Sequence, residues 1–265
     1  MTAKSDSVTG RLAISDLEIS FGSRQVVSID DLRLDHAEIL GLAGESGSGK
    51  SITTLAILGL AHTVGATVSG SISLDGQELM TLSQEDLRAI RGRRIAAIFQ
   101  NPSTAFNPVY RVGTIMTKAL RLHGVTKSDA ADQAAAAMRQ VLLPPDLMRR
   151  YPSQLSGGQL QRVAIALAVA LRAEILLADE PTSALDVTVQ AEVLDLLRDL
   201  RESIGMSILF ISHDLAVVAE LCDRVAVMRQ GLIVEQGPAG QVLSAPANPY
   251  TTELLESVPK LAGTT

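Results

Sequence analysis

Short apolar runs separated by turns make up the first part of this chain. Apolar and polar residues alternate over residues 12–20, 26–34 and 70–74, a pattern typical of half-buried strands. Residues 38–43, with the sequence E-I-L-G-L-A, form a short apolar run that fits a fully buried strand. Asp-Gly at residues 75–76 is a turn signal after the third alternating run. This region is therefore predicted to be rich in strands.

The middle of the chain changes character, and regular alternation returns after it. A polar and basic segment, residues 83–94, begins with Ser83, which is predicted to cap a helix with Asp86 three positions on. Residues 101–151 contain no strand-like run and include an alanine-rich helix over 130–141, so we expect a helical insertion. The alternation of apolar strands with amphipathic helices predicts an α/β fold with a parallel sheet covered by helices. The remaining predicted segments are strands at 95–99, 175–178, 208–211 and 225–228 and a helix at 189–200.

Charge and cysteine content exclude several classes of protein. The net charge is −6 and the pI is about 5.3, so nothing favours DNA or RNA as an electrostatic partner. The single cysteine, Cys222, excludes an internal disulfide and a multi-cysteine metal site within the chain. Its apolar surroundings predict a small core residue.

Hydropathy predicts a chain with much buried apolar surface that does not span a bilayer. Mean hydropathy is +0.24. The longest apolar stretch, residues 163–178, is interrupted by Arg172 and Glu174 and is too short to cross a membrane. Residues 1–10 are polar and lack the apolar core of a secretory signal. We therefore expect a cytosolic chain, one suited to docking on something larger.

A glycine-rich loop follows the predicted buried strand and precedes an apolar helix. Its sequence, G-E-S-G-S-G-K-S, has the form G-x-x-x-x-G-K-[ST]. Glycines let successive backbone N–H groups turn toward a phosphate, and the helix adds the positive end of its dipole. Lys50 is predicted to reach the outer phosphates and the Ser51 hydroxyl to bind Mg²⁺; a chance glycine-serine turn is the alternative. The predicted cradle consists of Gly44, Glu45, Ser46, Gly47, Ser48, Gly49, Lys50 and Ser51.

A second predicted anion site lies further along the chain, in the sequence L-S-G-G-Q at residues 155–159. Ser156 is a good helix N-cap, and Gly157 and Gly158 offer bare backbone N–H groups at the helix start. The chain thus has two helix ends predicted to bind phosphate, but only the first has a lysine, Lys50. We therefore expect the second end to bind a nucleotide held by another chain. An ordinary capped helix with two loop glycines is the alternative. The predicted apolar face of this helix comprises Leu160, Val163, Ala164, Leu167, Ala168 and Leu171.

Two carboxylates follow the apolar strand at residues 175–178. Asp179 is placed to hold the hydration shell of Mg²⁺, and Glu180 to orient and deprotonate an attacking water. Surface solvation is the alternative for such an acidic pair. His213 ends the next predicted buried strand, where it is placed to contact a γ-phosphate; without the other motifs it would be an ordinary strand-end residue.

Together these motifs resemble the ATPase subunit of an ABC transporter over essentially the whole chain. The resemblance implies a P-loop NTPase (RecA-like) core with an antiparallel β subdomain and a helical subdomain. It also implies one cassette over residues 1–265, with ATP and Mg²⁺ as its ligands. The implied parts are residues 1–100 (β subdomain and Walker A part of the core), 101–157 (helical subdomain), 158–240 (rest of the core) and 241–265 (short C-terminal tail).

The resemblance assigns a role to each motif. The glycine-rich loop corresponds to Walker A, L-S-G-G-Q with Gln159 to the signature motif, and residues 175–179 to Walker B. Glu180 takes the place of the catalytic carboxylate and His213 that of the switch histidine. Residues 183–186, which end in Asp186, resemble the D-loop. The implied Mg²⁺ ligands are Ser51, Gln100 (the Q-loop glutamine) and Asp179.

Two further positions depend on the resemblance alone. Phe21 stands where the family places an aromatic ring that stacks on adenine, and a core strand residue is the alternative. Ile52 departs from the pattern, because many members have threonine there, so any contact to the α-phosphate at this position must come from the backbone. No catalytic position is degenerate, and we expect a hydrolytically competent site.

Sequences near Gln100 and near the C-terminus are similar to those of the dipeptide, oligopeptide and nickel importer group. They are F-Q-N-P at residues 99–102, F-N-P at 106–108, D-V-T-V-Q at 186–190 and N-P-Y-T at 248–251. Longer members carry clustered cysteines after N-P-Y-T, so this chain resembles the shorter ones, which include nickel-type subunits. Peptide and metal-chelate substrates are left as equal alternatives.

The resemblance implies a set of partners at the cytoplasmic face of the inner membrane. Two cassettes would clamp two MgATP head to tail, with a distinct second ATPase as the expected partner, although the sequence also allows a homodimer. Two permeases and an extracytoplasmic solute-binding protein complete the implied importer, and no nucleic acid is expected. The alternatives are a soluble ABC ATPase of repair or translation and an exporter's cassette. Repair types need a long coiled-coil insertion and translation types two tandem cassettes, and neither is present.

Overall fold

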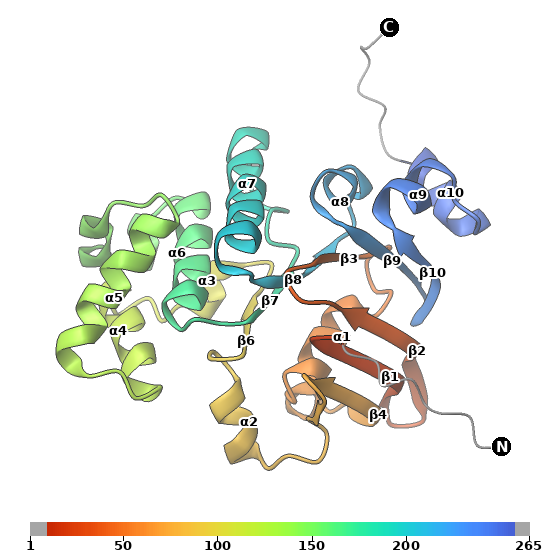
Figure 1. Ribbon diagram of the computed structural model, residues 1–265, viewed down its shortest axis with the longest axis horizontal. Coiled ribbons are helices and arrows are strands. Elements are labelled where there is room, and N and C mark those ends of the chain that lie inside the picture. The colour runs from red at the N-terminus through yellow and green to blue at the C-terminus, as the bar shows by residue number, and fades with distance from the viewer. Residues whose placement is uncertain (1–9, 258–265) are drawn as a thin grey trace, which may run out of the picture. The chain divides into compact units, whose positions relative to one another are not determined.

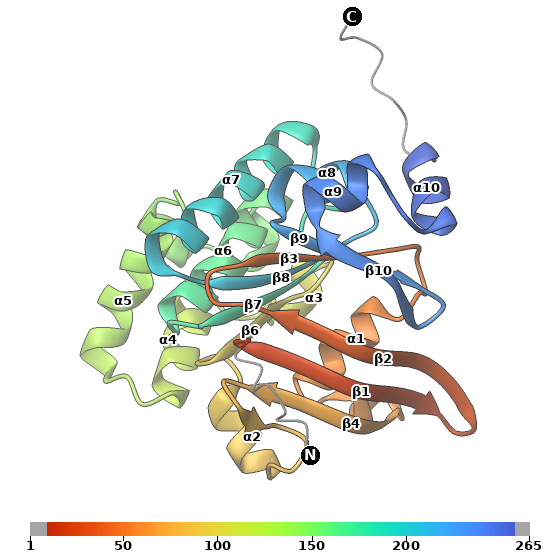
Figure 2. The ribbon, with the colours of Figure 1, turned by 45° about the vertical axis from the view of Figure 1, so that its right-hand side comes forward.

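The computed structural model describes residues 10–257, and the chain divides into two compact units. The first unit comprises residues up to 87 together with those from 213 onward, and the second comprises residues 88–212. Figures 1 and 2 show their helices and strands from two sides. The subdomain boundaries expected after residues 100, 157 and 240 stay predictions, because this division separates compact units and not the implied subdomains.

The first unit is built on a mostly antiparallel sheet. β1 pairs with β2 and with β4 in antiparallel register, and β9 pairs with β10 in the same way. β3 pairs with β9 in parallel, with Gly41 opposite Val225. The described strands of this unit follow the order β5-β4-β1-β2-β10-β9-β3. Their bounds are β1 Leu12–Phe21, β2 Arg24–Leu34, β3 Ile39–Ala43, β4 Thr67–Leu74, β5 Gln77–Glu78, β9 Arg224–Arg229 and β10 Leu232–Pro238.

The burial of each strand agrees with its pattern of apolar and polar residues. All five residues of β3 are buried, as expected for a continuous apolar strand, whereas β1 alternates between its two faces. The Asp75-Gly76 turn joins β4 to β5 as predicted, and Gly76 adopts a φ of +79°. Helices of this unit lie between β3 and β4, before β9 and after β10. Their bounds are α1 Lys50–Ile57, η1 Ala61–Val64, α8 Leu215–Leu221, α9 Ala239–Ser244 and α10 Pro249–Glu256.

The second unit pairs three parallel strands with a group of helices. β7 pairs in parallel with β6 on one side and β8 on the other. α4, α5 and α6 pack on one another, and they form the green group in Figure 1. The segment between residues 101 and 151 is helical, as predicted. Bounds are β6 Ile95–Ile98, β7 Ile175–Asp179, β8 Ser207–Ser212, α3 Pro102–Ala105, α4 Val112–Leu122, α5 Lys127–Gln140, η2 Pro145–Arg149, η3 Pro152–Gln154, α6 Gly157–Ala170 and α7 Val187–Ile204.

Some helices differ from the expected ones. α2, Gln84–Ile90, follows Ser83, whose hydroxyl accepts from the Asp86 N–H at 3.1 Å as predicted, but it ends before residue 94. α5 begins three residues earlier than the alanine run, because the Thr126 hydroxyl accepts from the Asp129 N–H. α6 is not one-sided: Ile165, Ala166 and others outside the predicted face are buried too, because helices and strand of the second unit surround it.

The C-terminal part holds more regular structure than the sequence pattern indicated. β10, α9 and α10 were not predicted, and the last two occupy much of the stretch expected to be a short tail. Cys222 follows α8 and is buried, as predicted, and this burial raises the pKa of its thiol. The thiol therefore stays protonated and unreactive. No helix among residues 10–257 has the length and apolar character to cross a bilayer.

Gly41 of β3 offers a test of how closely the first unit is packed. A Cβ added there would lie 2.8 Å from Val218 Cγ1 and 3.0 Å from Cys222 Sγ. We expect Gly41→Ala to lower the free energy of unfolding by about 1–3 kcal/mol because the strand and α8 must separate. Denaturant unfolding measures this. Gly240→Ala in α9, where no atom lies within 4 Å of the new Cβ, is the matched control and should not destabilise the chain.

Candidate functional site

The glycine-rich loop connects the buried strand β3 to α1 and requires glycine for two physical reasons. Gly44 adopts a φ of +150°, and a Cβ there would lie 2.1 Å from the Met228 carbonyl oxygen. Gly49 adopts a φ of +111°, and its Cβ would lie 2.7 Å from Val27 Cγ2. Both values of φ are unfavourable for residues with a side chain. The loop therefore curls tightly against β2 and β9, which hold it from behind.

Lys50 turns back into the loop that precedes it. Only 5% of its surface is exposed. Its ammonium donates to the carbonyl oxygens of Gly44 and Glu45, both at 2.7 Å, and to the Ser48 hydroxyl at 3.3 Å. The Ser48 N–H donates to the Glu45 carbonyl at 3.2 Å, which closes the turn. A positive charge is thus held inside a ring of backbone groups, where a phosphate oxygen would be a stronger acceptor than a neutral carbonyl.

Other predicted residues of the first unit lie at exposed positions. Phe21 ends β1 with 40% of its surface exposed, so the core alternative for this residue is wrong. Ser51 is exposed and Ile52 half-buried in the first turn of α1. His213 directly follows β8 and is also exposed. Asp214 beside it caps α8 by accepting from the Ala216 N–H at 2.9 Å.

The second unit brings three predicted polar residues together at the end of β7. Asp179 is its last residue and is buried. Glu180 follows in the left-handed region, with a φ of +48°, and its N–H donates to the Ile211 carbonyl on β8. The Gln100 amide nitrogen donates to the Glu180 carboxylate at 2.8 Å. A non-glycine residue at positive φ stores backbone strain, which neighbouring structure must hold in place.

The predicted signature segment begins α6 with a reciprocal pair of hydrogen bonds. The Ser156 hydroxyl accepts from the Gln159 N–H at 3.2 Å, and the Gln159 side chain accepts from the Ser156 N–H at 3.1 Å. This is a capping box, which fixes the helix start. The N–H groups of Gly157 and Gly158 are left at the positive end of the helix, where an anion is stabilised.

Packing against the next predicted motif requires glycine at position 158 but not at position 157. A Cβ on Gly158 would lie 2.3 Å from Val189 Cγ1, and one on Gly157 would lie 3.7 Å from Leu185. Asp186 caps α7 by accepting from the Val189 N–H at 3.0 Å. The start of α6 therefore packs on the predicted D-loop and the first turn of α7.

Comparison with known proteins identifies the family. Residues 18–183 match the family model described as "ABC transporter", which covers more than half of the chain. The chain belongs to the ABC transporter family. As a member of this family of P-loop ATPases, it is an enzyme that binds and hydrolyses ATP. The α/β fold with a P-loop core, predicted from the motifs, is confirmed by the likeness to solved ATP-binding cassettes.

Two relatives and one solved structure illustrate the likeness. A probable peptide ABC transporter ATP-binding protein of Sinorhizobium fredii is 43% identical over 94% of this chain and 76% of its own length. The oligopeptide transport ATP-binding protein OppD of Bacillus subtilis is 42% identical over 96% of this chain and 73% of its own length. The dimeric ATP-binding cassette MJ0796, in a post-hydrolysis state with ADP and Pi, has a TM-score of 0.73 at 25% identity, covering 86% of this chain and 98% of that one.

Two contacts at these motifs were not expected from sequence. The Gln100–Glu180 hydrogen bond joins residues 80 positions apart. The Tyr250 hydroxyl accepts from the Glu45 N–H of the phosphate loop at 3.3 Å, over 205 positions. The N-P-Y-T sequence that contains Tyr250 was noted as a mark of a subgroup, and no periodicity or local spacing indicates which loop it contacts.

Gly158 gives a test of the packing between α6 and α7. Gly158→Ala should lower the free energy of unfolding by about 1–3 kcal/mol, because the new methyl group overlaps Val189. The double variant Gly158→Ala/Val189→Ala should recover most of this loss. Val189 is only half-buried, so Val189→Ala alone should have a small effect and serves as the control. Denaturant unfolding of all three measures the coupling, and independent effects would contradict the contact.

Proposed function

We propose that this chain is the ATP-hydrolysing subunit that energises an ABC importer of peptides. The observation that carries the proposal is 42–43% identity, over more than nine-tenths of the chain, to proteins named as peptide and oligopeptide transport ATP-binding subunits. The N-P-Y-T and F-Q-N-P sequences, which resemble the same subgroup, support it. A metal chelate is the competing substrate, and the uptake experiment below separates the two.

In this proposal, residues 44–51 bind the phosphates of ATP. The glycines at positions 44 and 49 fit this role because their backbone leaves no room for a side chain. Lys50 turns part of its three donors from the loop to phosphate oxygens and neutralises their charge, while the Gly44 carbonyl continues to hold its ammonium. The exposed ring of Phe21 is available to stack on adenine, and Ile52 contributes its backbone N–H only.

Glu180 is proposed as the general base that takes a proton from the attacking water. It accepts a hydrogen bond from Gln100, which suits a charged carboxylate and fixes its direction. The strained backbone at Glu180 fits a residue whose position matters for chemistry. His213 is proposed to contact the γ-phosphate. The His213 side chain would lose this contact when hydrolysis removes that phosphate.

Mg²⁺ is proposed to bind with the nucleotide. The donors offered by Ser51, Gln100 and Asp179 are a hydroxyl, an amide carbonyl and a carboxylate, all oxygen, which is the set that Mg²⁺ prefers. Residues 10–257 contain no group of three His, Cys, Asp or Glu placed to hold a metal by themselves. This fits an ion bound largely by phosphate oxygens and water. When bound, it neutralises phosphate charge.

The signature segment is proposed to bind the nucleotide of a partner cassette. The chain has two helix starts of the phosphate-binding type, and the one at Ser156, Gly157 and Gly158 has no lysine of its own. A head-to-tail pair, with Gln159 and Asp186 at the contact, would use both. We further propose a distinct second ATPase, two permeases and a solute-binding protein as partners, at the cytoplasmic face of the membrane.

Glu180→Gln tests the chemistry without disturbing the local hydrogen bond, because a glutamine oxygen still accepts from Gln100. ATP should bind with unchanged affinity, while turnover falls at least ~10²-fold, the scale of general-base loss. Glu202→Gln, on the exposed face of α7, is the matched control and should leave turnover unchanged. Near-normal turnover of Glu180→Gln in the assembled complex would remove Glu180 from its proposed role.

Lys50→Ala should instead weaken MgATP binding.

The importer assignment is tested by purifying the chain from gently solubilised membranes of its own host. Two permeases, a second ATPase and a solute-binding protein should co-purify. Reconstituted vesicles should then take up a labelled oligopeptide in the presence of ATP, and the Glu180→Gln complex should not. Uptake of a nickel chelate but no peptide would overturn the substrate class. Recovery with ribosomes or DNA and no permease would overturn transport while leaving the ATPase intact.

A further inference from the structure

The C-terminal helix α10 places a tyrosine hydroxyl against the phosphate loop. Tyr250 is 2% exposed, and its hydroxyl accepts from the Glu45 N–H at 3.3 Å. That N–H belongs to the peptide group whose carbonyl is that of Gly44. The same carbonyl accepts from the Lys50 ammonium at 2.7 Å. One peptide group therefore has Tyr250 at its N–H end and Lys50 at its C=O end, and hydrogen bonds arranged in this way strengthen one another.

The N-P-Y-T sequence anchors this helix by its own hydrogen bonds. Asn248 caps α10, because its side-chain oxygen accepts from the Tyr250 N–H at 2.9 Å, and its side-chain nitrogen donates to the Val234 carbonyl at 3.2 Å. The Glu235 carboxylate on β10 accepts from the N–H groups of Ala247 at 2.7 Å and Asn248 at 3.1 Å. Pro249 occupies the first turn, where its missing N–H costs nothing. The start of α10 is thus attached to β10.

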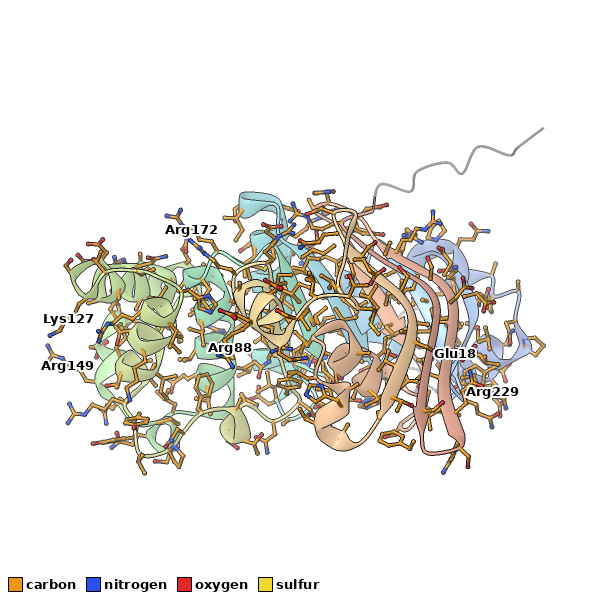
Figure 3. The ribbon with its side chains drawn as sticks, turned by 90° about the horizontal axis from the view of Figure 1, so that it is seen from below. Glu18, Arg88, Lys127, Arg149, Arg172 and Arg229 are labelled. Atoms are coloured by element: carbon orange, nitrogen blue, oxygen red, sulfur yellow. The ribbon has the colours of Figure 1, made fainter. Side chains whose placement is uncertain are left out.

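The aromatic ring of Tyr250 is held independently of its hydroxyl. The Arg229 guanidinium lies over the ring at 4.5 Å from its centre, a cation–π contact. Figure 3 labels Arg229 beside the C-terminal part of the chain. Burial raises the pKa of Tyr250, so the hydroxyl is neutral at physiological pH. Loss of the hydroxyl alone should therefore leave the ring in place.

We propose that Tyr250 is a positioning residue for ATP binding, which orients the Gly44–Glu45 peptide and through it the Lys50 ammonium. The proposal rests on the proposed role of residues 44–51 as the phosphate site. The geometry it requires is present without nucleotide, so the loop is ordered in advance and less conformational freedom is lost on binding. In this proposal the N-P-Y-T sequence has a function in this chain: it places the Tyr250 hydroxyl next to the phosphate loop.

Tyr250→Phe is the decisive variant, because it removes the hydroxyl and keeps the ring. We expect MgATP affinity to fall on the order of 3- to 10-fold, the effect of one hydrogen bond. In turnover assays KM for ATP should rise by a similar factor while kcat stays within about twofold, since the group acts on binding and not on the attacking water. Affinity is measured by calorimetric titration of the full chain with MgATP in the Glu180→Gln background, which slows hydrolysis.

A spectroscopic reading tests the contact itself. Without nucleotide, the Glu45 amide proton should exchange with solvent on the order of 3- to 10-fold faster in Tyr250→Phe than in wild type. Amides in the middle of β3 should keep their exchange rates. An unchanged Glu45 amide would overturn the proposal, whatever the binding data.

Two controls separate positioning from general loss of stability. Tyr110→Phe removes a tyrosine hydroxyl from the second unit and should leave MgATP affinity unchanged. Ile72→Val in β4, at a fully buried position, should destabilise the first unit by about 0.5–1.5 kcal/mol without changing affinity at a temperature well below unfolding. A loss of affinity in Ile72→Val equal to that in Tyr250→Phe would overturn the positioning role.

Failure of this inference differs from failure of the site assignment. If Lys50→Ala weakens MgATP binding and Tyr250→Phe leaves affinity, KM and Glu45 exchange unchanged, only the role of Tyr250 is overturned. If Lys50→Ala itself binds MgATP as wild type does, the phosphate-loop assignment and the inference built on it are both overturned.

Discussion

A buried lysine ammonium held by carbonyl groups of its own loop is the interaction on which the first unit depends. A charge removed from water is costly unless hydrogen bonds compensate for it. Lys50 meets this requirement only because the loop curls tightly enough to turn the Gly44 and Glu45 carbonyls toward it. That curl in turn needs a backbone without Cβ at Gly44, where Met228 of β9 lies directly behind. The buried strand β3 and its parallel pairing with β9 therefore hold the loop in the shape that places the Lys50 ammonium.

The second unit positions its functional groups with helix caps and a strand end. Glu180 follows the fully buried β7, and its backbone is tied to β8 through Ile211. The start of α6 is fixed by the pair formed by Ser156 and Gln159, and the start of α7 by Asp186. Each device uses a short polar side chain to satisfy N–H groups that a helix leaves open. These caps hold the motif residues in place more rigidly than a free loop would.

Local sequence patterns predict most of the strands and helix caps. The features that the sequence did not predict depend on contacts between residues far apart in the chain. Runs such as β3 and the caps at Ser83 and Ser156 can be read from neighbouring residues, because the physics that forms them is local. The strand β10 was missed because its sequence, L-I-V-E-Q-G-P, does not alternate between apolar and polar residues, and most of the strand is only half-buried. The breadth of burial around α6 was missed because it depends on which elements pack against it. The contact of Tyr250 with Glu45 spans 205 positions, and only the folded chain brings the two together.

The residues that carry the proposed function act on the phosphates of ATP. One helix start, at α1, has a lysine and strained glycines behind it, and the other, at α6, has only its cap and two glycines. Ser156 accepts from the Gln159 N–H, and Gly157 and Gly158 are the first two residues of the helix. Glycine at position 158 is needed for contact with Val189, so packing alone explains that residue. Packing does not explain Gly157, where a Cβ would fit at 3.7 Å from Leu185. Our proposal that this helix start binds the nucleotide of a partner cassette gives a reason for glycine at position 157 that packing does not give.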